Sequence, residues 1–262
     1  MRVFEYSHAL VREPGTSVVR GIRSDAGAAP DYDAILREHA SYVAALCAAG
    51  LTVEVLPPLE AFPDSVFVED PALVLSEGAI LLRPGAPSRL GESAAMREAL
   101  MRHFSRVTEL QGDEHADGGD ILVAPATIFI GISARTNRAG ARALAAKLGE
   151  FGRKSVIVDT PEGVLHFKTA VSLLDEETVL ATRHMAESGI FRDFRILTVP
   201  ESEEAAANAL RVNDVVLLGE EFHRTRDLVA EAGFDVRTLP VAEIGKLDAG
   251  LSCMSLRWLK RA

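Results

Sequence analysis

The stretch AGLSCMSLRW, residues 249–258, contains the features around which the chain is organised. Gly250 precedes an apolar alternating run, Leu251–Trp258, that predicts a strand near the C-terminus. This run holds one cysteine, Cys253, among small residues. A cysteine thiolate is the strongest side-chain nucleophile at neutral pH, but a lone cysteine is more often a small buried hydrophobe. The role of Cys253 therefore depends on whether the chain also supplies a histidine and an acid.

Before this stretch, a pattern of two short strands followed by a further strand recurs along the chain. A helix is expected before the further strand in every repeat but the third. The repeats begin near Ala72, Ile121, Thr169, Ala207 and Ser252, at spacings of 49, 48, 38 and 45 residues. A period of this length is typical of propellers and repeat arrays. The sequence therefore predicts a ring of five ββαβ units.

The fifth unit is cut short by the C-terminus, and the N-terminus supplies what is missing. A strand is expected at Arg2–Tyr6, a helix at Asp31–Ala49 and a strand at Thr52–Leu56. Pairing of the two chain ends would close the ring and remove its exposed sheet edges. We expect a single domain over residues 1–262, with a functional site in a central cavity. An apolar stripe of the helix is expected to bury Leu36, Ala40, Val43 and Cys47.

Composition excludes several classes of function. A formal net charge of −10 disfavours a nucleic-acid partner, because phosphates require clusters of Lys and Arg. Two cysteines provide no disulfide framework, which fits the reducing cytoplasm. There is no signal-peptide core and no apolar run of the roughly 18 residues that a membrane-spanning helix needs. Nucleotide-binding and metal-binding motifs are absent, so we expect no cofactor and no metal.

Polar residues recur where the units enter their first strands. Asp64, Glu69 and Asp70 precede the first unit, a pair of glycines with acids on both sides opens the second, and His166 precedes the third. Each of these three groups also has an ordinary structural interpretation: the acids as loop caps, the glycines as a plain turn, and His166 as a surface histidine. A ring would bring all of them to the same place, together with Cys253. This shared position favours a single site that binds a cation.

Two arginines, Arg89 and Arg135, each follow the second strand of a hairpin in successive units. Two guanidinium groups on one face could bind a carboxylate, although surface salt bridges are the ordinary alternative.

In combination and order, these motifs resemble those of the dimethylarginine dimethylaminohydrolases, members of the guanidino-group modifying superfamily with a five-bladed α/β-propeller fold. The similarity covers nearly the whole chain. It rests on FPDSVFVEDPA at 62–72, RPGAPSR at 83–89, DGGD at 117–120, ARTNRAGA at 134–141, HFKT at 166–169 and LSCMS at 251–255.

The resemblance implies a role for each matching residue. Cys253, His166 and Asp117 match the catalytic set, in which the cysteine forms a covalent S-alkylthiouronium intermediate. The implied substrate is a cationic guanidino amino acid, hydrolysed to citrulline and a methylamine. The residues implied to bind it are Glu69 and Asp70 at the guanidinium, Arg89 and Arg135 at the α-carboxylate, Asp64 at the α-amine, Ile22 in the lid, and Ser252 beside the nucleophile.

Two alternatives share the fold. An arginine deiminase, or another guanidino hydrolase or amidinotransferase, would use the same residues, but deiminases are usually longer and generally have Glu at the position of Asp117. The ribosome anti-association factor is a binding protein of the same fold that needs no Cys/His/acid set, and the net charge of −10 disfavours RNA. The sequence leaves open whether the chain forms a homodimer.

Overall fold

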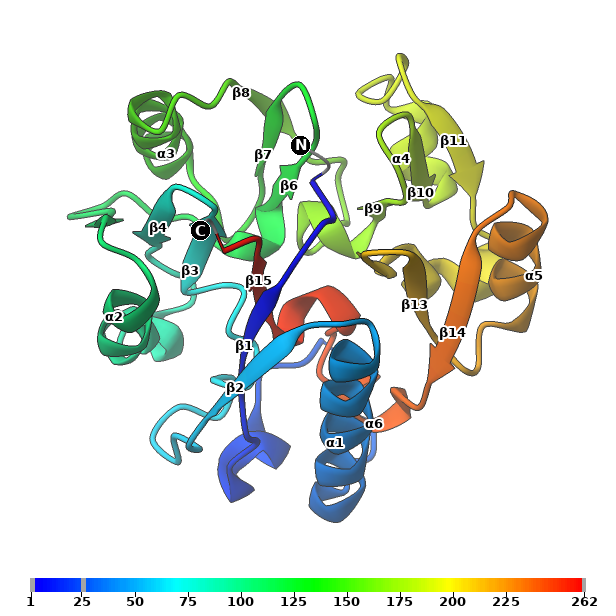
Figure 1. Cartoon of the computed structure of the whole chain (residues 1–262), viewed down its shortest axis with the longest axis horizontal. Helices are drawn as coiled ribbons and strands as arrows, with labels where there is room; N and C mark the ends of the chain where they lie inside the picture. Colours follow the sequence, from blue (N-terminus) through cyan, green and yellow to red (C-terminus); the bar gives the residue numbers. More distant parts are fainter. Residues whose placement is uncertain (1–2, 25–26, 261–262) are drawn as a thin grey trace.

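Five small sheets form a ring. The computed structural model describes residues 3–24 and 27–260, and its strands make five sheets of three strands each. Figure 1 shows these sheets arranged around a central axis like the blades of a propeller. The predicted five-bladed α/β-propeller is therefore confirmed.

Each sheet has the same topology. Its middle strand pairs antiparallel with the inner strand, which faces the axis, and parallel with the outer strand. From inner to outer edge, the sheets contain β3 (Ala72–Leu75), β4 (Gly78–Leu81) and β5 (Val107–Glu109); β6 (Ile121–Val123), β7 (Ile128–Ile132) and β8 (Ser155–Asp159); β9 (Val171–Leu173), β10 (Thr178–Ala181) and β11 (Arg195–Thr198); β12 (Leu210–Val212), β13 (Val215–Gly219) and β14 (Asp235–Leu239); and β15 (Leu256–Trp258), β1 (His8–Arg12) and β2 (Thr52–Leu56).

Helices connect the middle strand of each sheet to its outer strand, because parallel neighbours need a crossover connection. They lie at the rim of the ring in Figure 1. They are α1 (Tyr32–Ala48), α2 (Glu92–His103), α3 (Arg138–Glu150), α4 (Arg183–Glu187) and α5 (His223–Glu231), and a short α6 (Ala242–Gly245) follows β14. Apolar side chains from neighbouring units fill the spaces between the sheets.

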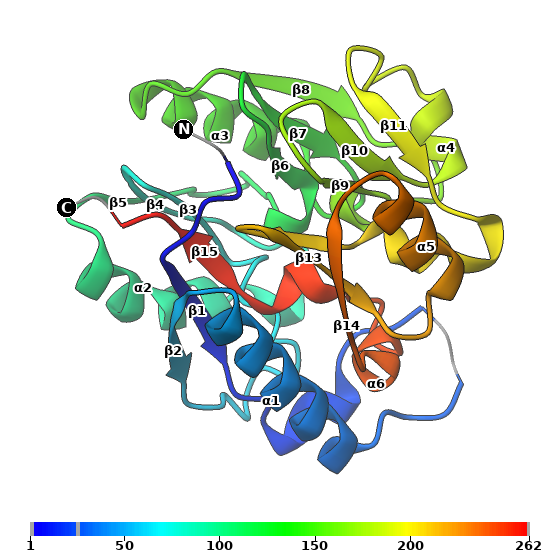
Figure 2. The same ribbon diagram turned by 45° about the vertical axis from the view of Figure 1, so that its right-hand side comes forward.

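The two chain ends close the ring as predicted, but with a different N-terminal strand. Strand β1 pairs with β15, placing His8 opposite Trp258 and Leu10 opposite Leu256, and Figure 2 shows the two strands side by side. The prediction of a strand at Arg2–Tyr6 is wrong for the described residues 3–6, while Arg2 lies outside the described residues. The observed strand ends at Arg12, a charged residue that is buried.

The burial of Arg12 is compensated by hydrogen bonds from its guanidinium to the Pro57 carbonyl oxygen and to Met96 Sδ.

The buried face of α1 differs from the predicted stripe. The helix buries Ile35, His39, Tyr42 and Leu46, whereas Cys47 is exposed. The predicted stripe was therefore displaced by one position, which is about 100° around a helix. A hydrogen bond of 2.5 Å between the hydroxyls of Tyr42 and Ser255 joins this face to the C-terminal segment.

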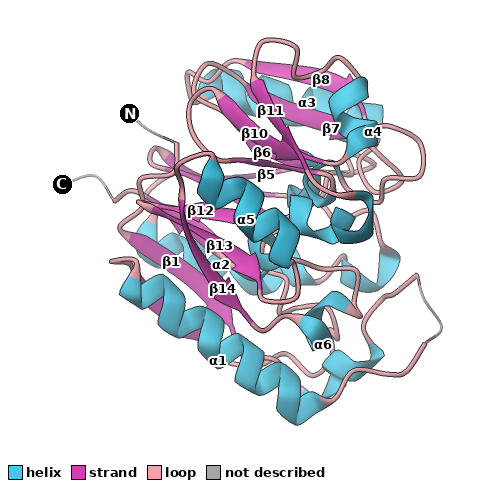
Figure 3. Ribbon diagram, turned by 90° about the vertical axis from the view of Figure 1, so that its right-hand side faces the viewer, coloured by secondary structure: helices cyan, strands magenta, loops and turns pink. Residues whose placement is uncertain are grey.

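Both chain ends leave the ring on one side, whereas α6 lies toward the other side (Figure 3). Within residues 3–24 and 27–260, no helix combines the length and the apolar character needed to cross a membrane.

Candidate active site

The predicted catalytic residues lie in short turns that lead into the inner strands. Asp117 precedes the 3₁₀ turn Gly118–Asp120, His166 precedes the 3₁₀ turn Phe167–Thr169, and Cys253 lies within the 3₁₀ turn Leu251–Met254. The expectation that Cys253 lies on a strand is wrong, because β15 begins only at Leu256. The apolar residues that predicted the strand instead reflect burial of the turn, because every residue from Leu251 to Leu256 is buried.

Asp117 and His166 form a hydrogen-bonded pair. His166 Nε2 lies 3.0 Å from Asp117 Oδ2, and the Gly85 backbone N–H donates to Asp117 Oδ1 at 2.7 Å. Burial alone would lower the pKa of His166, but the hydrogen bond that its ring donates to Asp117 and the charges of Asp70 and Asp120 outweigh burial and raise the pKa to about 9. His166 is therefore an imidazolium at neutral pH and can donate a proton to a leaving group.

The two glycines of DGGD allow the turns to approach one another. A Cβ on Gly118 would lie 1.9 Å from the Glu69 carbonyl oxygen, and one on Gly119 would lie 2.9 Å from His166 Cγ and 3.0 Å from Asp70 Oδ1. The Gly119 N–H donates to that same Asp70 oxygen at 3.0 Å. The double glycine therefore places Asp70 against His166, because any side chain there would separate them.

Cys253 is buried next to the carboxylates of the first unit. Its carbonyl oxygen accepts a hydrogen bond of 3.2 Å from the Glu69 N–H, which ties the fifth unit to the first. Burial, followed by the negative charges of Glu69 and Asp70, raises the pKa of the Cys253 thiol to about 11. At neutral pH the sulfur is a thiol, and a cation placed beside these carboxylates would favour the thiolate.

Asp70 is held by an internal counter-ion. Arg89 Nη1 lies 2.5 Å from Asp70 Oδ2, and burial of the carboxyl is outweighed by the charges of Arg89 and His166, so that the pKa of Asp70 is lowered. Asp70 is therefore a carboxylate that can hold a guanidinium beside Cys253.

Arg89 does not present the free fork that the sequence predicted. Its Nε and Nη2 bind Glu92 at 3.0 and 2.7 Å, and Nη2 also donates to the carbonyl oxygens of Asp64 and Phe67. The occupation of this fork by Glu92, three residues away, was not predicted from the sequence. A contact between Arg89 and a substrate carboxylate stays a prediction, with only one Nη1 hydrogen available to make it.

Arg135, in contrast, is half-buried, and no hydrogen bond or ion pair of its guanidinium is recorded among the described residues. Its charge acts on Asp64, whose Oδ1 accepts a hydrogen bond of 2.8 Å from the Ile22 N–H. Ile22 is exposed, and its segment is also attached through Ser24, whose hydroxyl donates to Asp248 at 2.8 Å. Arg135 and the Ile22 segment thus both lie near Asp64, and the contacts of these residues with a substrate stay a prediction.

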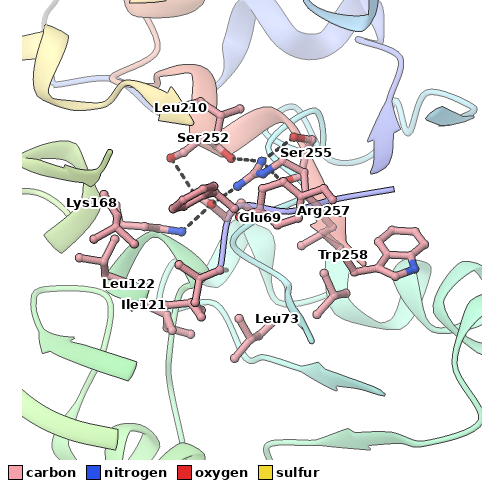
Figure 4. A pocket seen from close by; sticks show the side chains of 18 of the residues that line it. Glu69, Leu73, Ile121, Leu122, Lys168, Leu210, Ser252, Ser255, Arg257 and Trp258 are labelled. Atoms are coloured by element: carbon pink, nitrogen blue, oxygen red, sulfur yellow. Dashed lines mark hydrogen bonds and ion pairs between the residues drawn. The ribbon is translucent and has the colours of Figure 1, made fainter. Parts of the chain in front are cut away.

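A cavity of about 160 Å³ lies along the axis of the ring, lined by the inner strands and by Glu69, Lys168, Ser252 and Arg257. Figure 4 shows Glu69 at the centre of its polar lining. Glu69 is 2.5 Å from Lys168 Nζ and 3.5 Å from Arg257 Nη2, and it accepts from the Ser252 hydroxyl at 3.1 Å. Glu69 is thus already paired with cations, and its direct contact with a substrate stays a prediction.

A larger cavity of about 880 Å³ adjoins the catalytic turns on another side. Its lining includes Leu165 and Thr169 on both sides of His166, together with Gly250 and Leu251 before Cys253. The catalytic turns therefore have open space next to them that can admit a small molecule.

Donor atoms of Asp70, Asp117 and His166 lie within 4.8 Å of one another, as a metal site would require. These groups are already engaged with Arg89, Gly119 and each other. We therefore interpret the cluster as an acid–base set.

Four side chains that contact the predicted site residues were not predicted from the sequence, namely Asn208, Lys168, Glu92 and Arg257. Of these, Asn208 carried a usable signal, because it precedes β12 as Asp117 and His166 precede β6 and β9. The others acquire a role only through partners from other units.

The comparisons with known proteins agree with this geometry. The family model described as arginine deiminase matches residues 35–205. The chain is 39% identical to an N(G),N(G)-dimethylarginine dimethylaminohydrolase of Pseudomonas aeruginosa, over 97% of this chain and 100% of that protein. It is 34% identical to the protein of the same name from Streptomyces coelicolor, over 95% of this chain and 96% of that protein.

Solved structures give the same picture. A cysteine-to-serine mutant of the Pseudomonas aeruginosa enzyme complexed with citrulline superimposes with a TM-score of 0.94, at 39% identity and covering 97% of this chain and 100% of that one. A histidine-to-glycine variant of a dimethylarginine dimethylaminohydrolase, solved as an adduct with S-methyl-L-thiocitrulline, also superimposes with a TM-score of 0.94. It is 39% identical, and the match covers 96% of this chain and 99% of that one.

Proposed function

Because the chain belongs to the dimethylarginine dimethylaminohydrolase family, we propose that it hydrolyses Nω-methylated arginine to citrulline and dimethylamine or methylamine. The observation that carries this proposal is the Asp117–His166 pair beside Asp70 and Cys253, at the end of a ring that matches an enzyme bound to citrulline. The substrate class is a small cationic guanidino amino acid.

In the first step, Asp70 holds the guanidinium and Cys253 Sγ attacks its central carbon. A guanidinium is a poor electrophile, so the reaction depends on alignment of this carbon with the sulfur. Burial and then the carboxylate charges raise the pKa of Cys253 to about 11, and the bound cation offsets those charges and so favours the thiolate when substrate is present. The resting enzyme keeps its nucleophile protonated, and the thiol proton is released to solvent as the substrate binds, because His166 is already protonated.

His166 then acts first as an acid and next as a base. Its imidazolium donates a proton to the departing dimethylamine as the C–N bond breaks, which leaves a cationic S-alkylthiouronium on Cys253 and a neutral imidazole. The imidazole removes a proton from water as the water oxygen attacks the same carbon. The C–S bond breaks, the leaving thiolate takes up the remaining hydroxyl proton and returns to the resting thiol, and citrulline forms. Asp117 orients His166 and stabilises the imidazolium in both steps.

The amino-acid end of the substrate is assigned to Asp64, Arg135 and the Ile22 segment. These groups offer an anion for the α-amine and a guanidinium for the α-carboxylate. Ser252, through its bond to Glu69, supports the turn that carries the nucleophile.

The competing activity is arginine deimination, which the matching family model favours. Cys253, His166 and Asp117 would act on either substrate, so the space around the terminal nitrogens must discriminate. Differences of methylene size are worth about 1–3 kcal/mol each in an apolar pocket. We expect kcat/KM for asymmetric dimethylarginine to exceed that for arginine by one to a few orders of magnitude.

The measurement is competition kinetics at equal concentrations, with dimethylamine and ammonia quantified separately and Cys253→Ser as the background control. Faster release of ammonia from arginine than of dimethylamine would identify the protein as a deiminase.

Arg135 provides a test of substrate anchoring. Arg135→Ala is expected to raise KM for dimethylarginine about 10- to 150-fold, because a charge-assisted bond worth roughly 1.5–3 kcal/mol is lost. Turnover of methylguanidine, which has no carboxylate, should be unchanged. Arg138→Ala is the matched control, since Arg138 is exposed and pairs with Asp159. An equal loss of kcat/KM for dimethylarginine and for methylguanidine would show that Arg135 has only a structural role.

We also propose a cytoplasmic location, because the reaction needs Cys253 as a free thiol and the cytosol keeps thiols reduced.

A further inference from the structure

Asn208 occupies the position in the fourth unit that carries a functional side chain in each of the other four. It follows the 3₁₀ turn Glu201–Ala207 and stands just before β12. The corresponding entrances carry Asp70, Asp117, His166 and Cys253. Asn208 is 8% exposed, and it contributes to the lining of both cavities described above.

The side-chain amide of Asn208 spans the turn that holds the nucleophile. Its Oδ1 accepts a hydrogen bond of 3.3 Å from the Ser252 backbone N–H, and its Nδ2 donates to Cys253 Sγ at 3.7 Å. The first bond fixes the orientation of the amide, because a backbone N–H can be faced only by the oxygen. The nitrogen must therefore face the sulfur.

Gly250 makes this approach possible. A Cβ at residue 250 would lie 2.4 Å from Asn208 Cγ and 2.6 Å from Nδ2. The backbone of Gly250 is extended, with φ −133°, so its conformation alone does not require glycine. The absence of a side chain at this position is explained by the close contact with Asn208.

The sulfur lies in surroundings that oppose negative charge. It is buried near Glu69 and Asp70, so a hydrogen-bond donor aimed at it has a large effect on the thiolate. In the part of the chain that the structure describes, Asn208 is the one residue whose side chain donates to this atom. Sγ is also the leaving group in the second step, where it departs as a thiolate.

We propose that Asn208 is a further catalytic residue, whose Nδ2–H donates to Cys253 Sγ, stabilises the thiolate both as nucleophile and as leaving group, and holds the sulfur in position. This proposal rests on the proposed covalent role of Cys253. It assigns the fourth unit a part in the chemistry, so that all five units contribute a side chain to the reaction.

The test separates the bond to sulfur from the bond to the backbone. Asn208→Asp keeps an oxygen for the Ser252 N–H but replaces the donor that faces Sγ with a second oxygen, whereas Asn208→Leu removes both bonds. Each variant is made in a Cys47→Ser background, because Cys47 is exposed and would also react. Alkylation of Cys253 by iodoacetamide is followed from pH 7 to 11 in the absence of substrate.

In Asn208→Asp the alkylation profile is expected to shift upward by at least about one pH unit, which is roughly a tenfold slower reaction at a fixed pH below the pKa. The value of kcat should fall at least tenfold, while KM stays within about threefold, because Asn208 does not hold the substrate. Asn137→Asp is the matched control. It makes the same change at the exposed N-cap of α3, where aspartate also caps. The alkylation profile and kcat should both stay unchanged.

Thermal unfolding identifies the variants that retain the fold. A folded Asn208→Asp or Asn208→Leu protein that is alkylated with the unaltered profile would overturn the proposal. An unaltered alkylation profile in Asn208→Asp together with slower alkylation in Asn208→Leu would also overturn it, since that pattern means that Asn208 supports only the backbone. Alkylation does not depend on which guanidine is the substrate, so this result is independent of the proposed function.

Discussion

Cys253→Ser is expected to abolish citrulline formation, with kcat reduced by roughly 10⁴-fold or more. A serine hydroxyl in the same buried place, beside Glu69 and Asp70, is far harder to ionise than a thiol. Removing one member of a catalytic set that acts as a unit costs about as much as removing the set. The measurement is single-turnover release of dimethylamine, which reports the first step without the second.

Cys47→Ser is the control for this experiment, because Cys47 is exposed on α1 and has no catalytic partner in the described structure. It should retain turnover close to that of the unmodified protein. Mass spectrometry of quenched turnover should find the covalent adduct on Cys253 alone. Normal turnover by Cys253→Ser would exclude the covalent mechanism.

Asp117→Asn is expected to reduce kcat by about 10⁴-fold, through the wrong ring tautomer of His166. The Gly85 N–H fixes Oδ1 as the oxygen of the new amide, so the amide nitrogen would face His166 Nε2. That ring nitrogen must then accept a hydrogen bond and cannot carry the proton of the imidazolium. The pH profile of kcat/KM should lose activity at a lower pH than the profile of the unmodified protein.

The same substitution has a signature in stability. The folded-state pKa of His166 is raised to about 9 from 6.5, so protonation of His166 stabilises the fold fully below about pH 6.5 and this contribution is lost as the pH rises to about 9. The difference in free energy of unfolding between the unmodified protein and Asp117→Asn should therefore shrink over this range, by at most about 1.4 kcal/mol per pH unit. Asp113→Asn, in a neighbouring loop, is the control. A difference that stays constant from pH 6 to 9.5 would contradict the raised pKa.

The sequence predicted the units of the fold but misplaced some of their buried faces. Apolar periodicity located the repeats because it is a local property of strands and helices. It failed at α1, where Cys47 turned out to be exposed, and at β1, whose last residue is the charged but buried Arg12. Both errors concern residues whose burial depends on partners from distant parts of the chain, such as Met96 for Arg12 and Ser255 for Tyr42.

The candidate site was predicted residue by residue, but not its connections. The motifs placed Cys253, His166, Asp117 and Asp70 at the entrances of the inner strands, and the structure brings these entrances together. The polar residue at the fourth entrance was missed, although Asn208 precedes β12 as Asp117 and His166 precede β6 and β9. Its contacts with Cys253 Sγ, with the Ser252 N–H and with Gly250 identify it as part of the nucleophile's surroundings.

The sequence by itself therefore determined the five-unit ring, the glycines that permit close approach and the side chains available for chemistry, because these follow from local patterns. The tertiary structure decided what each of those side chains can do. It engages Arg89 with Glu92 and pairs Glu69 with Lys168. It raises the pKa of Cys253 through burial and through carboxylates from another unit, and it joins Asp117 to His166 across 49 residues of sequence. Charge, burial and hydrogen bonding act through space, so they are fixed only when the ring closes.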